Sequence, residues 1–282
     1  MTVYVLPFEK MHGLGNDFIM LERRHLPNGV DERELAKYLC NRHYGIGADG
    51  IIIVDFSTTQ EADFIWNYYN NDGSEAEMCG NGMRCFAKYV YERGFTDSNS
   101  FSVLTKAGII IPTLEEDGTI TVNMGKPRLV GPVLQKLSVN SKEIEYTFVE
   151  VGNPHFVCIN DNEIGDELFF NLGPKIEKHK IFPSGINAEF VKIVNRSEIK
   201  VRVWERGVGP TLACGTGACA SVVGANTRGL CNRTVEVHLP GGVLNIRWDE
   251  RSENIYLNGT ATFVYIGQLN LDPKLVCKTI VN

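Results

Sequence analysis

The chain has 282 residues, of which 43% are hydrophobic and 22% charged, so it is long enough for two domains that each have a core. Its formal net charge of -6 and the lack of clustered Lys and Arg argue against nucleic acid as a partner. No apolar run approaches the roughly 18 residues that span a bilayer, and the N-terminal residues lack the pattern of a signal peptide. We therefore expect a cytoplasmic protein with neither a nucleic-acid nor a membrane partner.

Eight cysteines are spread along the chain. They are not clustered as in small secreted domains, so we expect most of them to be reduced thiols. The sequence contains neither a Cys-x-x-Cys pair nor a nearby histidine group that could complete a four-ligand zinc site. No metal is therefore expected.

The motifs of the first half return in the same order in the second half, about 135 residues later. Four pairs of segments share this offset: 15–18 with 152–156, 35–39 with 172–176, 77–82 with 212–217, and the hairpin-like 107–125 with 241–259. Several matches in one order at a nearly constant offset indicate an internal duplication.

The duplication predicts an α+β protein of two pseudo-symmetric domains, each a mixed sheet wrapped around a central helix. The expected domains are residues 1–126 and 127–268, with the tail 269–282 returning to the first. One helix in each half should begin at a Cys-Gly-x-Gly motif and end before Gly94 or Gly229. Runs of β-branched and aromatic residues predict strands that include 50–56, 64–69, 145–150 and 199–204.

A cysteine stands directly before each of these two predicted helices, at Cys79 and Cys214. The unpaired N–H groups at a helix start stabilise a thiolate and can bind a carboxylate, so we expect two low-pKa thiols. One acid-base thiol from each half suits racemisation or epimerisation, in which a proton leaves one face of a carbon and another arrives at the opposite face. The other six cysteines are predicted to be core residues: Cys40, Cys85, Cys158, Cys219, Cys231 and Cys277.

Further motifs surround both cysteines: KMHGLGNDF at 10–18, YNNDGS at 69–74, CGNG at 79–82, GNPH at 152–155, NAEF at 187–190, WERG at 204–207 and ACGTG at 213–217. With these motifs the chain resembles the diaminopimelate epimerase family over essentially its whole length. The resemblance implies interconversion of LL- and meso-2,6-diaminopimelate in the route to lysine and cell-wall precursors, without pyridoxal phosphate, another cofactor or a metal. It also implies two similar domains that meet at an active-site cleft. The expected partners are the small-molecule substrate and a second copy of the chain in a homodimer.

By motif position, the resemblance makes Cys79 and Cys214 the base and the acid, which exchange roles with the direction of reaction. His155 and Glu205 would support the ionisation of the thiols. Gly50 stands where some members carry a substrate-contacting amide, so no contact is assigned there. Backbone donors would hold the reacting end of the substrate: Gly80, Asn81, Gly215 and Thr216. Polar side chains would bind the distant amino-acid head: Asn16, Asn70, Asn153, Asn187, Glu205 and Arg206.

Other interpretations stay open. A proline or hydroxyproline racemase or a phenazine-type isomerase would use similar paired helices, but its substrate would make little use of the Asn, Glu and Arg set. A thiol-redox protein or an amino-acid-binding module would use the two cysteines as a regulatory disulfide. Residue by residue, an Asn beside a glycine is often only a turn residue, Glu205-Arg206 could be a solvated pair, and His155 could be structural.

Overall fold

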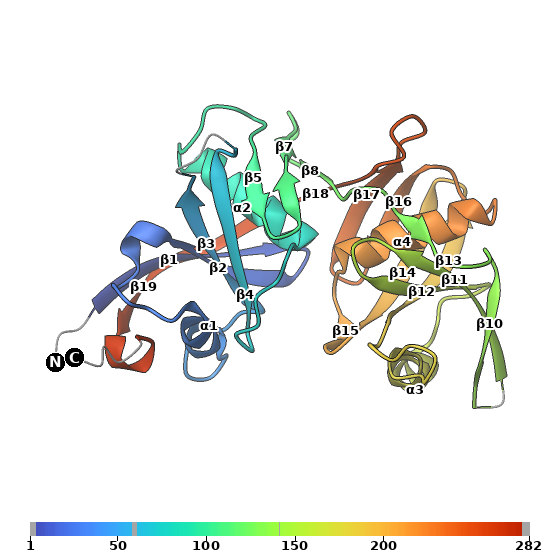
Figure 1. The fold of residues 1–282 in the computed structure, drawn as a ribbon. Coiled ribbons are helices and arrows are strands. Elements are labelled where there is room, and N and C mark those ends of the chain that lie inside the picture. Colours follow the sequence, from blue (N-terminus) through green and yellow to red (C-terminus); the bar gives the residue numbers. More distant parts are fainter. Residues whose placement is uncertain (1–3, 58–60, 141, 278–282) are drawn as a thin grey trace. The chain divides into compact units, whose positions relative to one another are not determined.

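The computed structural model describes residues 4–57, 61–140 and 142–277, and the chain forms two compact units (Figure 1). Unit 1 comprises Met1–Val122 and Thr260–Asn282, and unit 2 comprises Asn123–Gly259. The chain thus returns to unit 1 earlier than the predicted end at residue 268. The reason is that β19 (Thr262–Leu271) is one continuous strand paired along β1 (Tyr4–Gly13). Of the predicted tail, residues 278–282 lie outside the described residues.

Unit 1 contains a mixed sheet with the strand order β19-β1-β2-β3-β4-β5-β6, in which β2 and β3 are parallel, as are β4 and β5. Its other strands are β2 (Asn16–Glu22), β3 (Gly50–Phe56), β4 (Phe64–Asn70), β5 (Val103–Thr105) and β6 (Gly108–Ile110), and an antiparallel hairpin of β7 (Thr113–Leu114) and β8 (Ile120–Asn123) follows in the sequence. Its helices are α1 (Glu32–Cys40), α2 (Gly80–Glu92), η1 (Arg23–His25) and η2 (Pro273–Leu275).

The two α-helices of unit 1 pack on opposite faces of its sheet, as the alternation of side chains along β3 shows. Ile51 and Ile53 lie in one core cluster with Leu35 of α1. Ile52 points the other way, and its Cδ1 would lie 3.2 Å from a Cβ placed on Gly82 of α2. Helix α2 therefore lies directly against the sheet, with no side chain at Gly82 to hold it off.

Unit 2 repeats this arrangement around a sheet with the strand order β10-β11-β12-β13-β14-β16-β17-β18. Its strands are β9 (Arg128–Leu129), β10 (Gln135–Val139), β11 (Lys142–Glu150), β12 (Pro154–Asn160), β13 (Asn187–Asn195), β14 (Glu198–Glu205), β15 (Gly209–Thr211), β16 (Thr234–Leu239), β17 (Gly242–Trp248) and β18 (Ile255–Gly259). Its helices are α3 (Asp166–Glu177) and α4 (Gly215–Thr227).

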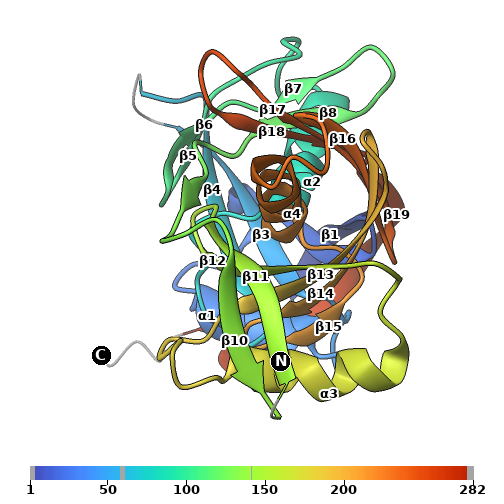
Figure 2. The same cartoon turned by 90° about the vertical axis from the view of Figure 1, so that its right-hand side faces the viewer.

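In unit 2 the two helices again lie on different faces, and Figure 2 shows them on different sides of β13 and β14. Phe156 on β12 shares a core cluster with Phe169 of α3. The next residue, Val157, faces α4, where a Cβ on Gly224 would lie 2.9 Å from Val157 Cγ1. Small residues on every side of α4 let the sheet close around it, as predicted for a central helix.

The predicted fold class, an α+β pair of similar domains, is confirmed, and the strands predicted at 50–56, 64–69, 145–150 and 199–204 correspond to β3, β4, β11 and β14. Helices α1 and α3 were not predicted; they occupy the segments 35–39 and 172–176, which the sequence showed only as a repeat. The predicted hairpin over 107–125 is wrong, because β6 pairs with β5 and β8 pairs with β7. A tight turn at Gly118 closes a shorter loop between β7 and β8. Within the described residues, no helix is long and apolar enough to cross a membrane.

Candidate active site

In unit 1 the site begins at Cys79, the residue directly before α2. Its Sγ accepts a hydrogen bond from the backbone N–H of Gly82 at 3.5 Å and donates to Asn16 Oδ1 at 3.8 Å. A Cβ at Gly82 would lie 2.8 Å from the Trp66 ring, so only glycine allows this close packing. The sulfur is thus held at the first turn of α2, between a backbone donor and a side-chain acceptor.

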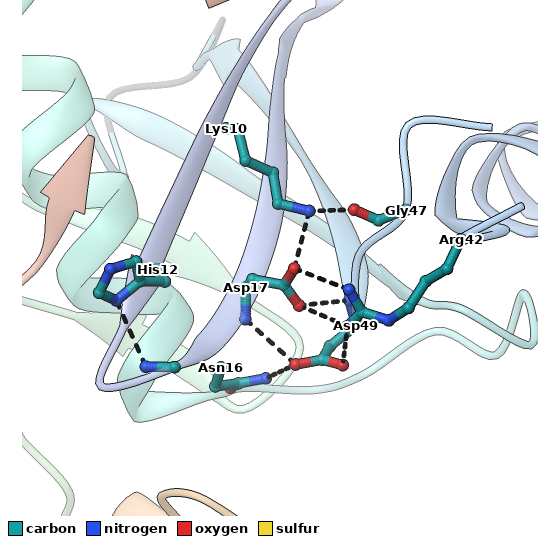
Figure 3. Close-up of polar contacts among 8 residues, drawn as sticks. Lys10, His12, Asn16, Asp17, Arg42, Gly47 and Asp49 are labelled. Atoms are coloured by element: carbon teal, nitrogen blue, oxygen red, sulfur yellow. Dashed lines mark hydrogen bonds and ion pairs between the residues drawn. The ribbon is translucent and has the colours of Figure 1, made fainter. Parts of the chain in front are cut away.

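Asn16, the first residue of β2, connects Cys79 to the rest of the site. Its Oδ1 also accepts a hydrogen bond from Asn81 Nδ2 at 3.2 Å, and its Nδ2 donates to Asp49 Oδ2 at 2.8 Å (Figure 3). Asn16, Cys79 and Asn81, all selected from the sequence, therefore lie together. Sequence reasoning missed Asp49, because nothing in its spacing from Asn16 indicates the contact.

Asp49 belongs to an ion-pair network at the same end of the sheet (Figure 3). Arg42 Nη2 lies 2.8 Å from Asp17 Oδ1 and 2.9 Å from Asp49 Oδ1, and Lys10 Nζ lies 2.7 Å from Asp17 Oδ2. Burial acts to raise the pKa of Asp17, but hydrogen bonds from Arg42 and Lys10 hold that pKa well below its usual range. The network therefore keeps the Asp17 carboxylate charged close to Asn16.

Asn70, the last residue of β4, makes its side-chain hydrogen bonds locally. Its Oδ1 accepts from the Tyr68 hydroxyl at 2.7 Å and its Nδ2 donates to Ser74 Oγ at 2.9 Å. Gly50 is its partner across the sheet, and a Cβ at Gly50 would lie 2.4 Å from the Tyr68 ring. The Tyr68 ring therefore fills the space that a side chain at position 50 would need, which explains the glycine there.

In unit 2 the corresponding residue is Cys214, directly before α4. Its Sγ accepts the backbone N–H of Gly217 at 3.4 Å and lies 3.5 Å from Thr216 Oγ1. A Cβ at Gly217 would lie 2.9 Å from Glu189 Oε1 and 3.3 Å from Cys214 Sγ. The thiol is therefore enclosed by α4 and by a buried carboxyl group from β13.

The prediction of a low-pKa thiol is wrong for Cys214 in this structure. Burial raises the pKa of Cys214 well above its usual value, and the carboxyl groups of Glu205 and Glu189 raise it further. The hydrogen bonds from Thr216 and Gly217 lower it, but by less. Burial and the two nearby carboxyl groups destabilise a thiolate more than the hydrogen bonds at the helix start stabilise it. Cys214 is therefore a protonated thiol.

Glu205, the last residue of β14, is hydrogen-bonded to Cys214. Its Oε1 also accepts from Thr211 Oγ1 at 2.6 Å. Burial raises the pKa of Glu205, and the hydrogen bonds from Thr211 and Cys214 act in the opposite direction. A carboxyl group with a raised pKa beside a thiol is suited to exchange a proton with it.

His155 is fully buried and lies between two polar partners that are not cysteines. Its Nδ1 lies 2.7 Å from Glu189 Oε1, and its Nε2 lies 2.7 Å from Asn153 Oδ1. Since an amide oxygen only accepts, Nε2 carries the hydrogen and fixes the Asn153 amide. Glu189 is also fully buried, and burial raises its pKa. Sequence reasoning missed Glu189, although a glutamate between Ala188 and Phe190 in a strand was a visible signal.

Asn187 and Arg206 lie together at the adjoining strand ends. Asn187 Nδ2 donates to the Pro154 carbonyl at 2.9 Å, and its Oδ1 accepts the backbone N–H of Arg206 at 2.9 Å. The exposed Arg206 guanidinium donates to the Ser184 carbonyl at 3.3 Å. Asn187 therefore shapes the backbone beside His155, and Arg206 presents its charge to solvent.

The remaining cysteines do not share these surroundings. Burial raises the pKa of Cys40 and of Cys85 to about 12, and that of Cys158 and of Cys231 to about 11. Five of the six predicted core cysteines are buried: Cys40, Cys85, Cys158, Cys219 and Cys231. Cys277 is only partly buried.

Known proteins resemble this chain in both sequence and fold. The family described as diaminopimelate epimerase matches residues 8–130 and 147–264. The diaminopimelate epimerase of Heliobacterium modesticaldum is 47% identical over 94% of this chain and 100% of its own length. A chloroplastic diaminopimelate epimerase of Oryza sativa subsp. japonica is 43% identical over 93% of this chain and 79% of its own length.

Two solved structures show a similar fold at much lower identity. A phenazine biosynthesis protein of the PhzF family from Bacillus anthracis superposes with a TM-score of 0.71 at 16% identity, covering 96% of this chain and 100% of that one. A hydroxyproline epimerase from Agrobacterium vitis gives a TM-score of 0.72 at 14% identity, covering 95% and 93%. These two likenesses concern the fold, whereas the matched family and its relatives extend over most of the sequence. On that evidence, the chain belongs to the diaminopimelate epimerase family.

Proposed function

We propose that this protein interconverts LL- and meso-2,6-diaminopimelate, with one thiol from each unit acting on opposite faces of the substrate α-carbon. The observation that carries the proposal is the equivalent position of Cys79 and Cys214. Each stands directly before a helix and accepts the N–H of the residue three positions later. A pair of thiols related in this way suits removal of a proton by one and delivery by the other.

The protonation state of Cys214 before substrate binds assigns the acid and base roles for one direction of the reaction. Its raised pKa keeps it a thiol, which makes it the acid, and Cys79 is then the base. Cys79 as thiolate takes the α-proton, Cys214 gives its proton to the opposite face of the carbon, and the two residues end with exchanged protonation. Glu205, hydrogen-bonded to Cys214, would take up the thiol proton when the enzyme works in the other direction.

The helix starts would also stabilise the carbanion that forms between these steps. Gly80, Asn81, Gly215 and Thr216 lie in the first turns of α2 and α4, where backbone N–H groups point towards the N-terminal end of the helix. Such donors can bind the substrate carboxylate beside the reacting carbon and stabilise negative charge as it develops.

We propose that the distant amino-acid head is bound by the polar set that includes Asn16, Asn70, Asn153, Glu205 and Arg206. Two features support this role. The exposed Arg206 guanidinium can bind a carboxylate through two parallel hydrogen bonds. The Asn153 oxygen is occupied by His155, which leaves its amide nitrogen as the group that can donate to a ligand. Asn187 would act through Arg206, whose backbone it holds.

The proposal extends to the cofactors, cellular location, oligomeric state and pathway of the enzyme. We infer that it acts without pyridoxal phosphate or metal, in the cytoplasm, as a homodimer, in the formation of lysine and cell-wall precursors. Activity that persists after treatment with hydroxylamine and with EDTA would support independence from a cofactor. Sedimentation analysis would test the dimer, and a monomer that retains full activity would contradict it.

The decisive experiment is incubation of the reduced protein with LL-diaminopimelate in deuterated water. We expect deuterium at the α-carbon of the meso product, and no turnover of proline or hydroxyproline under the same conditions. Exchange on proline alone would instead favour a racemase for a single-headed substrate. A folded, reduced protein that exchanges neither substrate would refute the proposed function.

A further inference from the structure

We infer that Arg84 and Asp49 are positioning residues, the two charged ends of a hydrogen-bond chain that fixes the side-chain amides of Asn81 and Asn16 beside Cys79. Arg84 Nη2 donates to Asn81 Oδ1 at 3.1 Å, and Asn81 Nδ2 donates to Asn16 Oδ1 at 3.2 Å. Asn16 Nδ2 then donates to Asp49 Oδ2 at 2.8 Å. The inference rests on the proposed role of Cys79 and adds two residues that act through others.

The charges at the two ends determine which way each amide points. A guanidinium can only donate and a carboxylate can only accept, so every link must run from Arg84 towards Asp49. Turning the Asn16 amide over would place its oxygen against the Asp49 carboxylate and its NH₂ against the NH₂ of Asn81. Both contacts would then be repulsive, so the observed orientation is strongly favoured.

Arg84 and Asp49, the two ends of this hydrogen-bond chain, are each held by further contacts. Arg84 is fully buried, and it also donates from Nε to the Thr260 carbonyl at 3.0 Å and from Nη1 to the Gly80 carbonyl at 3.4 Å. At the other end, Asp49 is held by Arg42 and by the backbone N–H of Asp17 at 3.1 Å (Figure 3). Neither Arg84 nor Asp49 can move away without breaking these additional hydrogen bonds and ion pairs.

The consequence concerns the Cys79 thiol, which donates to the same Asn16 oxygen at 3.8 Å. An amide oxygen facing the sulfur favours the protonated thiol, whereas an amide NH₂ there would favour the thiolate. The hydrogen bonds from Arg84 to Asp49 therefore hold Asn16 in the orientation that stabilises the Cys79 thiol, the form that this residue takes once it has accepted the α-proton. Loss of the Asp49 acceptor would remove one of the two contacts that oppose a turned Asn16 amide, so its NH₂ would face the sulfur in a larger share of the molecules.

The test measures alkylation of Cys79 by iodoacetamide across the thiol titration range, resolved by peptide mass spectrometry in the folded, substrate-free protein. In Asp49→Ala the midpoint should move to lower pH, and alkylation at neutral pH should be about threefold faster. Asp49 is 40% exposed, so this variant should fold. Asp55→Ala, which loses a similar contact with Arg23 in the same unit, should leave Cys79 alkylation unchanged.

Two further variants separate orientation from charge. Asp49→Asn keeps an oxygen that can accept from Asn16, so it should alkylate like the wild type; if it matches Asp49→Ala, the loss of charge explains the effect and the inference is wrong. In an Asn16→Ala background, Asp49→Ala should change neither alkylation nor epimerisation kcat by more than about twofold. Additive effects of the two substitutions would likewise overturn the inference. Because alkylation needs no substrate, a failure of the proposed function would leave this result readable.

Discussion

Cys79 and Cys214 stand in the same relationship to their helices, since each Sγ accepts the backbone N–H of the residue three positions later, at 3.5 and 3.4 Å. Their side-chain surroundings differ, because Cys79 contacts the neutral Asn16 amide and Cys214 contacts the Glu205 carboxyl group. Equivalent backbone positions therefore carry different proton-transfer partners, and the predictions below follow from this difference.

Removing either thiol should abolish two-base chemistry. We expect Cys79→Ala and Cys214→Ala each to lower kcat for epimerisation by about a thousandfold or more, since no other group replaces the missing acid or base. Cys85→Ala, in the second turn of α2 and fully buried, is the control and should retain most activity. The measurement is meso-diaminopimelate formation under reducing conditions. Comparable rates in all three variants would contradict the assignment of the two thiols.

Neutralising Glu205 should separate reactivity from catalysis at Cys214. In Glu205→Gln the negative charge that raises the Cys214 pKa is removed, so that pKa should fall and alkylation of Cys214 above neutral pH should accelerate. Epimerisation should nevertheless slow by about a hundredfold, because the proton acceptor is lost. Glu198→Gln, at the other end of β14, serves as the control. Slower alkylation in Glu205→Gln would show that Glu205 does not raise the Cys214 pKa.

A methyl group at Gly217 should disturb the site more than its size suggests. Replacing a glycine inside a helix by alanine usually stabilises the helix by about 0.5–1 kcal/mol, and Gly217 is the third residue of α4. Here the new Cβ would lie 2.9 Å from Glu189 Oε1 and 3.3 Å from Cys214 Sγ, so we expect a lower Tm and at least about a tenfold loss of kcat. Gly165→Ala, with no atom within 4 Å of its Cβ, is the comparison. A Gly217→Ala protein of unchanged Tm and activity would contradict the close packing at Cys214.

The Asp17 ion pairs should stabilise unit 1 in a pH-dependent way. Because the folded-state pKa of Asp17 lies below its usual 3.8, its contribution is fully present above that value and is lost as the pH falls through the folded-state pKa. Asp17→Asn should therefore lower the free energy of unfolding by about 2 kcal/mol at neutral pH, and by progressively less in acid. Urea unfolding at several pH values measures this, with the exposed Asp97→Asn as control. A difference that stays constant down to strongly acid pH would rule out the ion pairs as its source.

Much of the fold followed from the sequence because it depends on local patterns. Periodicity and glycine placement identified α2, α4 and four strands, and repetition identified the two domains. The sequence did not predict helices α1 and α3, because their segments stood out only as a repeat. The predicted hairpin over 107–125 was wrong because the tighter turn at Gly118 lets β8 pair with β7 instead of with β6. The return at residue 260 depends on the pairing of β19 with β1, which no local pattern encodes.

Some residues of the site could likewise be identified from the sequence, and others only from the structure. The sequence by itself singled out Cys79 and Cys214, because a cysteine before a glycine-rich helix start is a local arrangement that occurs twice. Only the tertiary structure decided that Asp49 binds Asn16, that Glu189 binds His155 and that Tyr68 fills the space beside Gly50. These contacts depend on how strands align across a sheet. The structure alone also decided the direction of the Cys214 pKa shift, because the cost of desolvating a charge depends on how closely the surrounding chain packs around it.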